Sequence, residues 1–335
     1  MSYSGAYPLW DYGWMMGDQV RNQAYYRALQ NVITPDTVVA DIGAGAGLFS
    51  LMACQLGARK VYAIEPSPAV WLAGELAQKN GFGDRVECFQ ALSTEINLPE
   101  KVDVVVSDLR SFLPYHLGHL AAIADIKERL LKPGGVLIPE RDRVYASVVQ
   151  AEKVYRRCVS PWGDSNFGLD FSAMGSKLAN TFHKLHPRDS VVKLSPSHQL
   201  TSLEYLGDCP VNLQANLSSS IETSGTGHGL MLWFDSYLGE SAFFSNDLDS
   251  PELIYGAAFL PWETPLVVSE GDTLELGVGA NLVGDHYVWS WKVSTSYPEN
   301  NIALNQSTFF GSLLSPAKSQ TGKSTSSKSP PRKPS

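Results

Sequence analysis

The segment that most constrains this fold is residues 38–50, which read VVADIGAGAGLFS. A short apolar run leads into three glycines at alternate positions, Gly43, Gly45 and Gly47, and a helical stretch follows. Glycine lets the backbone turn sharply and approach a ligand closely, because it carries no Cβ. The segment therefore predicts a strand, a glycine loop and a helix, which together begin a nucleotide-binding α/β domain.

Four further β-branched runs alternate with helical stretches up to about residue 150. Amphipathic helices are expected between them, including residues 68–80 and 119–131. Apolar runs separated by helices indicate a parallel sheet with both faces covered. The repeated strand–helix–strand units predict a doubly wound fold. The four runs lie at residues 60–64, 85–89, 102–106 and 135–138.

The pattern changes after about residue 150. Short segments of alternating polarity appear there, separated by Gly, Ser and Pro, as is typical of antiparallel strands. Near the end, residues 315–335 carry five basic residues, no acidic residue and few apolar ones, so they cannot bury enough surface to fold. We expect an α/β domain at residues 1–145, a β-rich domain at 146–312 and a disordered basic tail at 313–335.

Composition excludes several classes of protein. The four cysteines are scattered, without a Cys-x-x-Cys pair or a histidine at metal spacing, so neither a disulfide framework nor a metal site is expected. No apolar run approaches the roughly 20 residues that span a bilayer, and the first residues lack the pattern of a signal peptide. No basic patch outside the tail indicates nucleic-acid binding. We expect a cytoplasmic protein without a membrane or nucleic-acid partner.

Two features near the glycine loop indicate which cofactor it binds. A dinucleotide fingerprint needs its third glycine at position 48, where Leu48 stands. Glu65 ends the second predicted strand, where a carboxylate can hydrogen-bond a ribose. The pattern Asp-x-Gly-x-Gly-x-Gly, which begins at Asp41, resembles the first motif of class I methyltransferases. This resemblance implies S-adenosylmethionine, with Asp41 beside its amine and Glu65 on its ribose; NAD(P) and an empty loop are the alternatives.

Segments on both sides of this motif resemble protein arginine N-methyltransferases. Residues 14–25 (WMMGDQVRNQAY) are similar to that family's N-terminal helix, which implies that Met15 covers the cofactor and that Arg21 binds its carboxylate. Ser93 is also assigned to the cofactor site. The likeness covers residues 10–295 and implies a Rossmann-like class I methyltransferase domain, a β-barrel-like domain and a homodimer. Further similar segments are 57–65, 98–107, 131–139, 166–172, 232–235 and 262–266.

The resemblance fails where that family binds the substrate guanidinium, through two glutamates on the loop after the fourth strand. Asp108 stands at the first glutamate position on a shorter stem, and Leu117, which cannot bind a cation, stands at the second. The family's Thr-His-Trp loop aligns with residues 253–255 (LIY), so its histidine is also missing. Arg110 adds a positive charge beside the pocket, which disfavours a second cation.

Three functions remain open. The first is methyl transfer to a smaller amine or hydroxyl, with Asp108 and either His116 or His119 as candidate proton acceptors, because histidine titrates near neutral pH. The second is methylation of arginine at a guanidinium site rebuilt from other carboxylates. The third is a non-catalytic scaffold that binds the cofactor. We expect a methyltransferase acting on a guanidino or amine nitrogen of a protein or small molecule, with Asp108 and His116 as catalytic residues.

Overall fold

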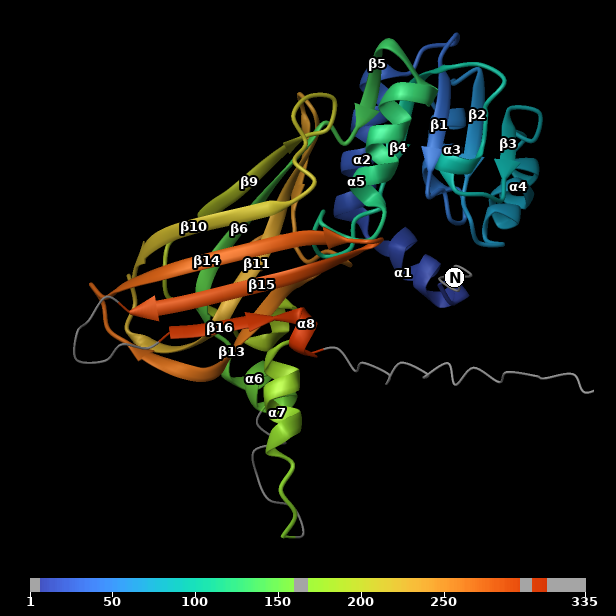
Figure 1. Ribbon diagram of the computed structural model, residues 1–335. Helices are drawn as coiled ribbons and strands as arrows, with labels where there is room; N and C mark the ends of the chain where they lie inside the picture. The colour runs from blue at the N-terminus through green and yellow to red at the C-terminus, as the bar shows by residue number, and fades with distance from the viewer. Residues whose placement is uncertain (1–6, 160–167, 296–302, 312–335) are drawn as a thin grey trace, which may run out of the picture.

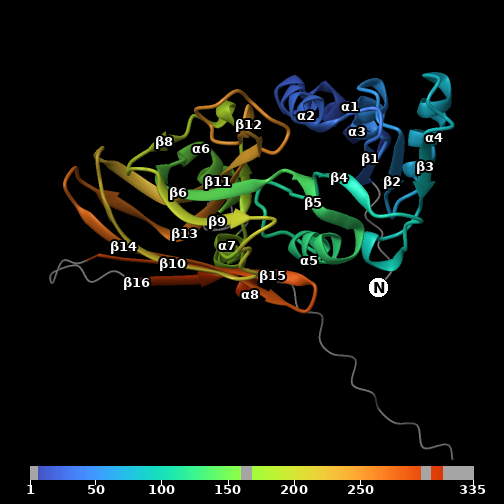
Figure 2. The same cartoon turned by 90° about the horizontal axis from the view of Figure 1, so that it is seen from above.

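The computed structural model describes residues 7–159, 168–295 and 303–311, which form two lobes (Figure 1). The elements of the N-terminal lobe are α1 (Leu9–Gly17), α2 (Gln19–Val32), β1 (Val38–Ile42), α3 (Leu48–Gln55), β2 (Lys60–Ile64), α4 (Val70–Lys79), β3 (Val86–Phe89), η1 (Ser93–Glu95), β4 (Val102–Ser107), α5 (His119–Asp125), η2 (Ile126–Leu130) and β5 (Leu131–Ile138). Its five parallel strands have the order β3-β2-β1-β4-β5. Figure 2 shows α5 on one face of this sheet and α2 and α3 on the other. The expected parallel α/β fold is confirmed.

The elements of the N-terminal lobe follow from their residues. β1 is buried along its whole length, because it lies between β2 and β4 at the centre of the sheet. The N-terminal helix is in fact two helices, because Asp18 interrupts it and its carboxylate caps α2 by accepting the backbone N–H of Arg21. The helix expected at residues 119–131 ends at Asp125, and a π-helical turn, η2, leads directly into β5.

The second lobe is built from antiparallel strands. Its elements are β6 (Arg141–Gln150), α6 (Glu152–Cys158), α7 (Ser172–Ala179), β7 (His183–Leu185), η4 (Pro187–Asp189), β8 (Val192–Lys193), β9 (His198–Glu204), β10 (Leu213–Ser220), β11 (Gly225–Gly239), β12 (Ala242–Ser245), β13 (Ala257–Val268), β14 (Thr273–Val283), β15 (His286–Thr295), β16 (Ala303–Ser307) and α8 (Thr308–Gly311). One sheet follows the path β7-β13-β11-β6-β8, with β12 on β11 and β9 on β6; the other has the order β10-β14-β15-β16. The described strands thus form two antiparallel sheets, and their hydrogen bonds do not close a barrel.

The chain passes between the lobes at residues 138–141. β5 ends the parallel sheet at Ile138, and β6 begins at Arg141 and pairs with β11. The boundary expected at 145/146 therefore falls inside β6, because the alternation of the second lobe starts earlier than the sequence indicated. The predicted tail at 313–335 lies outside the described residues, as do the first two residues of the segment 166–172.

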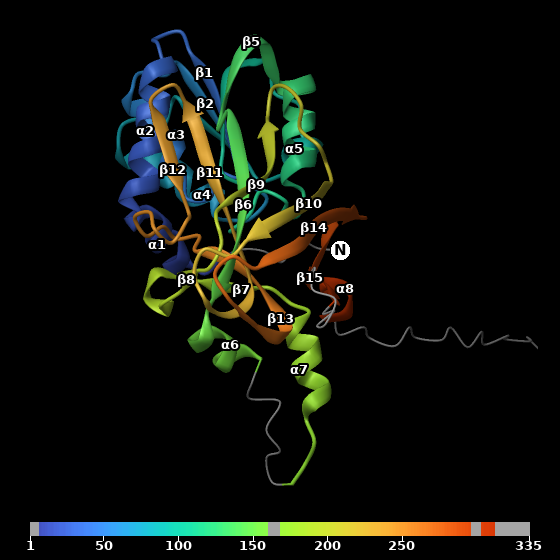
Figure 3. The same cartoon turned by 90° about the vertical axis from the view of Figure 1, so that its left-hand side faces the viewer.

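The two lobes meet along one continuous hydrophobic core. α2 packs against β12, and both lie at the junction in Figure 3. The carboxyl ends of β1 and β4 consequently face the start of the second lobe. In the described ranges, no helix is long and apolar enough to cross a membrane, and no cluster of His, Cys, Asp and Glu could hold a metal ion.

Candidate active site

The glycine loop between β1 and α3 brings the backbone close to other elements. Gly43, Gly45 and Gly47 have φ angles of 75°, 52° and 84°, a conformation that L side chains rarely adopt. A Cβ at Gly45 would lie 2.8 Å from the ring of Tyr12 in α1, and one at Gly47 would lie 2.5 Å from the Cβ of Ala73 in α4. Glycine is therefore required here by both conformation and space.

Two carboxylates, Asp41 and Glu65, lie at the ends of the strands beside this loop. Asp41 Oδ2 accepts the backbone N–H and the hydroxyl of Ser50 at 2.9 and 2.7 Å, while Oδ1 is buried without a partner among the described residues. Burial raises the pKa of Asp41 to about 7. Glu65 accepts the N–H groups of Gly45 and Ser67 at 3.2 and 2.9 Å. The carboxylates can accept further donors, so they fit a ligand with an amine and hydroxyls.

Helix α1 covers this loop near the carboxyl end of β1 (Figure 1). Tyr12, which sequence reasoning missed, lies over Gly45, and its hydroxyl is 3.4 Å from Ser67 Oγ. Met15 is three residues further along the same helix, so its side chain shares a face with Tyr12. This spacing is the signal that would have identified Tyr12. The Met15 carbonyl accepts a hydrogen bond from Arg21 Nη2 at 2.8 Å, so α1 is tied to α2.

Ser93 lies in η1, which follows β3. Ser93 is buried, and its backbone carbonyl accepts a 2.8 Å hydrogen bond from Arg129 Nη2. These contacts fix the backbone after β3 without involving the Ser93 hydroxyl. The assignment of Ser93 to the cofactor site stays a prediction.

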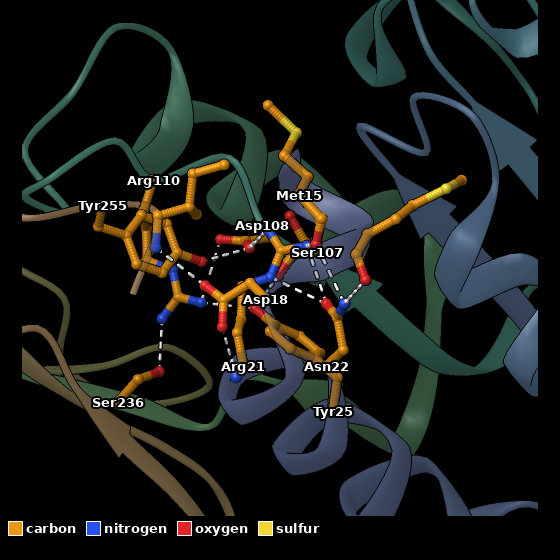
Figure 4. A network of polar contacts seen from close by, with 12 residues as sticks. Met15, Asp18, Arg21, Asn22, Tyr25, Ser107, Asp108, Arg110, Ser236 and Tyr255 are labelled. Carbon is orange, nitrogen blue, oxygen red and sulfur yellow. Dashed lines mark hydrogen bonds and ion pairs between the residues drawn. The ribbon is translucent and has the colours of Figure 1, made fainter. Parts of the chain in front are cut away.

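Asp108 follows β4, and three donors contact its carboxylate (Figure 4). Arg21 Nη1 lies 3.3 Å from Oδ2, and Arg110 Nη2 lies 3.2 Å from Oδ1. The Tyr255 hydroxyl donates a short hydrogen bond to Oδ2. The Asp108 side chain is only 7% exposed. The structure thus brings together Arg21 and Asp108, which the sequence assigned to cofactor and acceptor, and adds Tyr255 from the segment 253–255.

Both terminal nitrogens of Arg110 are paired in this network, although its Nε has no partner among the described residues. Its Nη1 donates to both Asp142 oxygens, at 2.8 and 3.1 Å, and to Ser236 Oγ. Its Nη2 donates to the hydroxyl of Tyr25 as well as to Asp108. Burial alone would lower the pKa of Arg110, but Asp142 and Asp108 hold it well above its ordinary value. The positive charge expected beside the pocket is therefore present, but it is buried and paired.

The histidines after β4 lie apart from this network. His116 is half-buried in the turn before α5. Burial lowers its pKa, and the nearby His286 lowers it further. Among the described residues, no hydrogen bond or ion pair joins His116 to Asp108. His119 is buried with Nε2 3.1 Å from the Tyr205 hydroxyl, and burial lowers its pKa to about 3. His119 is therefore neutral and structural at physiological pH.

Comparison with known proteins agrees with this geometry. The family model of the ribosomal protein L11 methyltransferase (PrmA) matches residues 23–139. Protein arginine N-methyltransferase 2 of Dictyostelium discoideum is 32% identical over 162 residues, which are 48% of this chain and 31% of that protein. The histone-arginine methyltransferase CARMER of Drosophila ananassae is 27% identical over 274 residues, which are 78% of this chain and 51% of that protein. The chain is similar to proteins named as arginine N-methyltransferases.

A solved structure of an arginine methyltransferase complex has the same fold. The Trypanosoma brucei PRMT1 enzyme–prozyme heterotetrameric complex with AdoHcy aligns with a TM-score of 0.81 at 20% identity, over 92% of this chain and 99% of that one. This likeness confirms the expected combination of a Rossmann-like parallel sheet and an antiparallel domain. The comparisons also support S-adenosylmethionine as the cofactor. The chain spans about half, or less, of the length of the curated relatives it matches.

Proposed function

We propose that this chain binds S-adenosylmethionine at the glycine loop and transfers its methyl group to a guanidino or amine nitrogen. The observation that carries the proposal is the loop itself, with Asp41 Oδ1, which has no partner in the described part of the chain, on one side and Glu65 on the other. A buried carboxylate oxygen without a donor is costly unless a ligand supplies one. The relatives named as arginine methyltransferases support nitrogen as the acceptor atom.

The residues of the loop would divide the binding of the cofactor between them. Asp41 would receive its amine, and Glu65 would accept its ribose hydroxyls. Arg21, oriented by Met15 and Asn22, would bind its carboxylate, and Tyr12 and Met15 would exclude water from the loop. When bound, S-adenosylmethionine supplies a methyl group activated by its sulfonium and is left as S-adenosylhomocysteine.

Asp108 and His116 are the proposed catalytic residues, and they have unequal support. Asp108 lies beside Arg21 and would orient the acceptor nitrogen, which is positioning rather than strong base catalysis. His116 would accept the proton that the acceptor loses. Its lowered pKa keeps it in the neutral form that can accept a proton. However, His116 lies in the turn before α5, and it has no hydrogen bond or ion pair with Asp108 among the described residues.

The test is transfer of labelled methyl from S-adenosylmethionine to three pools: arginine-rich peptides, a whole proteome and small metabolites. S-Adenosylhomocysteine affinity is measured in parallel by calorimetry, with Asp41→Asn as the binding-deficient control. Label in any pool supports the methyltransferase, and the pool identifies the acceptor class. Cofactor binding without label in any pool contradicts the proposal and favours the non-catalytic scaffold. Absence of cofactor binding contradicts both.

We also propose a cytoplasmic homodimer. α6 and α7 project from the second lobe (Figure 3), where the family resemblance places a dimerisation arm, and the solved relative is described as a multimeric complex. The four free cysteines are in keeping with a reducing compartment. Analytical ultracentrifugation should give twice the mass of 36.6 kDa, and a monomer at micromolar concentration would exclude a stable homodimer.

A further inference from the structure

The side chain of Arg110 lies in a guanidinium-binding pocket made by the protein itself, which pairs both of its terminal nitrogens. The side chain is 0% exposed. Its Cζ lies 5.2 Å from the ring centroid of Phe234 and 5.4 Å from that of Phe244, distances at which aromatic faces attract a cation. Phe234 belongs to β11 and Phe244 to β12, so the second lobe supplies both rings.

The polar part of this pocket comes from both lobes. Asp108 and Tyr25 belong to the N-terminal lobe, whereas Asp142 and Ser236 belong to β6 and β11. Carboxylates in the plane of the guanidinium and rings over its face are what a protein presents to recognise arginine. Here the recognised guanidinium is the chain's own.

The Asp108 carboxylate is therefore already satisfied by the protein's own donors. Arg110 holds Oδ1 of Asp108, while Arg21 and Tyr255 hold Oδ2. The two arginines and the two aspartates, Asp108 and Asp142, balance in charge without a ligand. Nearby Asp18 is also engaged, because its two oxygens accept the backbone N–H groups of Arg21 and Ile254.

We propose that Arg110 is an internal occupant of the acceptor subsite, which excludes cationic acceptors from Asp108 and leaves a neutral nitrogen as the acceptor. This inference rests on the proposed function, because it specifies the acceptor class of the same site. An acceptor's guanidinium at Asp108 would be the third there; it would meet the positive charges of Arg21 and Arg110, and both oxygens of Asp108 are already paired. A neutral nitrogen has no such penalty and carries the lone pair that methyl transfer needs.

The test compares a peptide that contains one arginine with the same peptide that contains citrulline, whose urea group has a similar shape but no charge. Binding of each is measured by calorimetry with saturating S-adenosylhomocysteine. The variant is Arg110→Met with Asp142→Asn, which removes the occupant and its buried counter-charge together. The matched control is Arg59→Met with Glu100→Gln, an arginine–carboxylate pair that is exposed on the N-terminal lobe.

The wild-type protein and the Arg59/Glu100 control should not prefer the arginine peptide over the citrulline peptide. The Arg110/Asp142 variant should bind the arginine peptide at least tenfold more tightly than wild type does, with no change for citrulline. A wild-type preference of tenfold for the arginine peptide overturns the inference, and this comparison needs no variant. The inference is also overturned if the variant keeps its circular dichroism and its S-adenosylhomocysteine affinity but binds the arginine peptide no more tightly than wild type does.

Failure of the proposed function gives a different result. If the proposed function is wrong, the wild-type protein transfers no label to any pool. That measurement does not depend on Arg110. Label on peptidyl arginine in wild type would support the methyltransferase and overturn the role of Arg110.

Discussion

The two halves of the candidate site differ in how much of their bonding capacity the protein itself uses. In the cofactor half, Asp41 has a buried oxygen without a partner in the described residues. The glycine loop there has a backbone on which there is no room for side chains. In the acceptor half, both oxygens of Asp108 are held by the protein's own donors. The first half is arranged for a ligand, and the second is arranged around Arg110.

This difference implies that the two halves of the site have different roles. The acceptor half joins the lobes, because Arg110 contacts α2, β6 and β11, so changes there should alter stability first. The cofactor half belongs to one lobe, so changes there should alter affinity with little effect on the fold.

The largest expected effect is on stability. Arg110→Met should lower the free energy of unfolding by about 3–5 kcal/mol, because it leaves Asp142 as a buried charge without its partner. Urea denaturation measures the change. Arg59→Met is the control; its pair with Glu100 is 50% and 38% exposed, so it should lose no more than about 1 kcal/mol. Equal losses of unfolding free energy in the two variants would show that Arg110 contributes no more to stability than an exposed ion pair does.

The next effect is on turnover. Asp108→Asn keeps the shape of the side chain but removes the charge that faces Arg21 and Arg110, so we expect turnover to fall about 100-fold. Initial rates with the acceptor found in the labelling experiment give the change. The dissociation constant for S-adenosylhomocysteine should stay within about threefold of wild type, because Arg21 keeps its contacts with Met15 and Asn22. Unchanged turnover would remove Asp108 from the mechanism.

A third effect separates the halves by pH. The Asp41 pKa of about 7 means that the free protein carries a protonated Asp41 at pH 5.5. A ligand amine, protonated over this range, binds the ionised form, so affinity should tighten about tenfold from pH 5.5 to 7. Calorimetry across this range measures the slope, and Asp41→Asn should bind weakly with no slope. A wild-type slope of zero would place the amine elsewhere.

The same shift affects stability in the opposite direction. The pKa of Asp41 is higher in the folded protein than its ordinary value of 3.8. Between about pH 4 and 7 the unfolded chain therefore loses this proton while the folded chain keeps it. This group alone makes the ligand-free protein less stable as the pH rises through that window, and bound cofactor should reduce the loss.

The sequence predicted the strands, the loop and the helix that carry the cofactor half, because they are local. Asp41, the three glycines and Glu65 lie within one strand–loop–helix–strand unit, where spacing determines geometry. It predicted the acceptor half poorly, because Arg110 is paired by residues from distant segments. Nothing near residue 110 indicates that Asp142 and Ser236 face it, since only the packing of β6 beside β11 brings them there. The position of β6 also explains why the predicted boundary fell within a strand.

The smallest expected effect concerns His116, which the sequence placed with Asp108. Its backbone N–H donates to the Pro114 carbonyl and its own carbonyl accepts the N–H of His119, so His116→Gln should leave the turn intact. The acceptor's proton can also leave to water, so we expect turnover to fall only about fivefold, with loss of the lower limb of the pH profile. The measurement is the pH profile of kcat/KM for both forms. Unchanged turnover with an unchanged lower limb would remove His116 from the mechanism and leave this turn separate from the acceptor half.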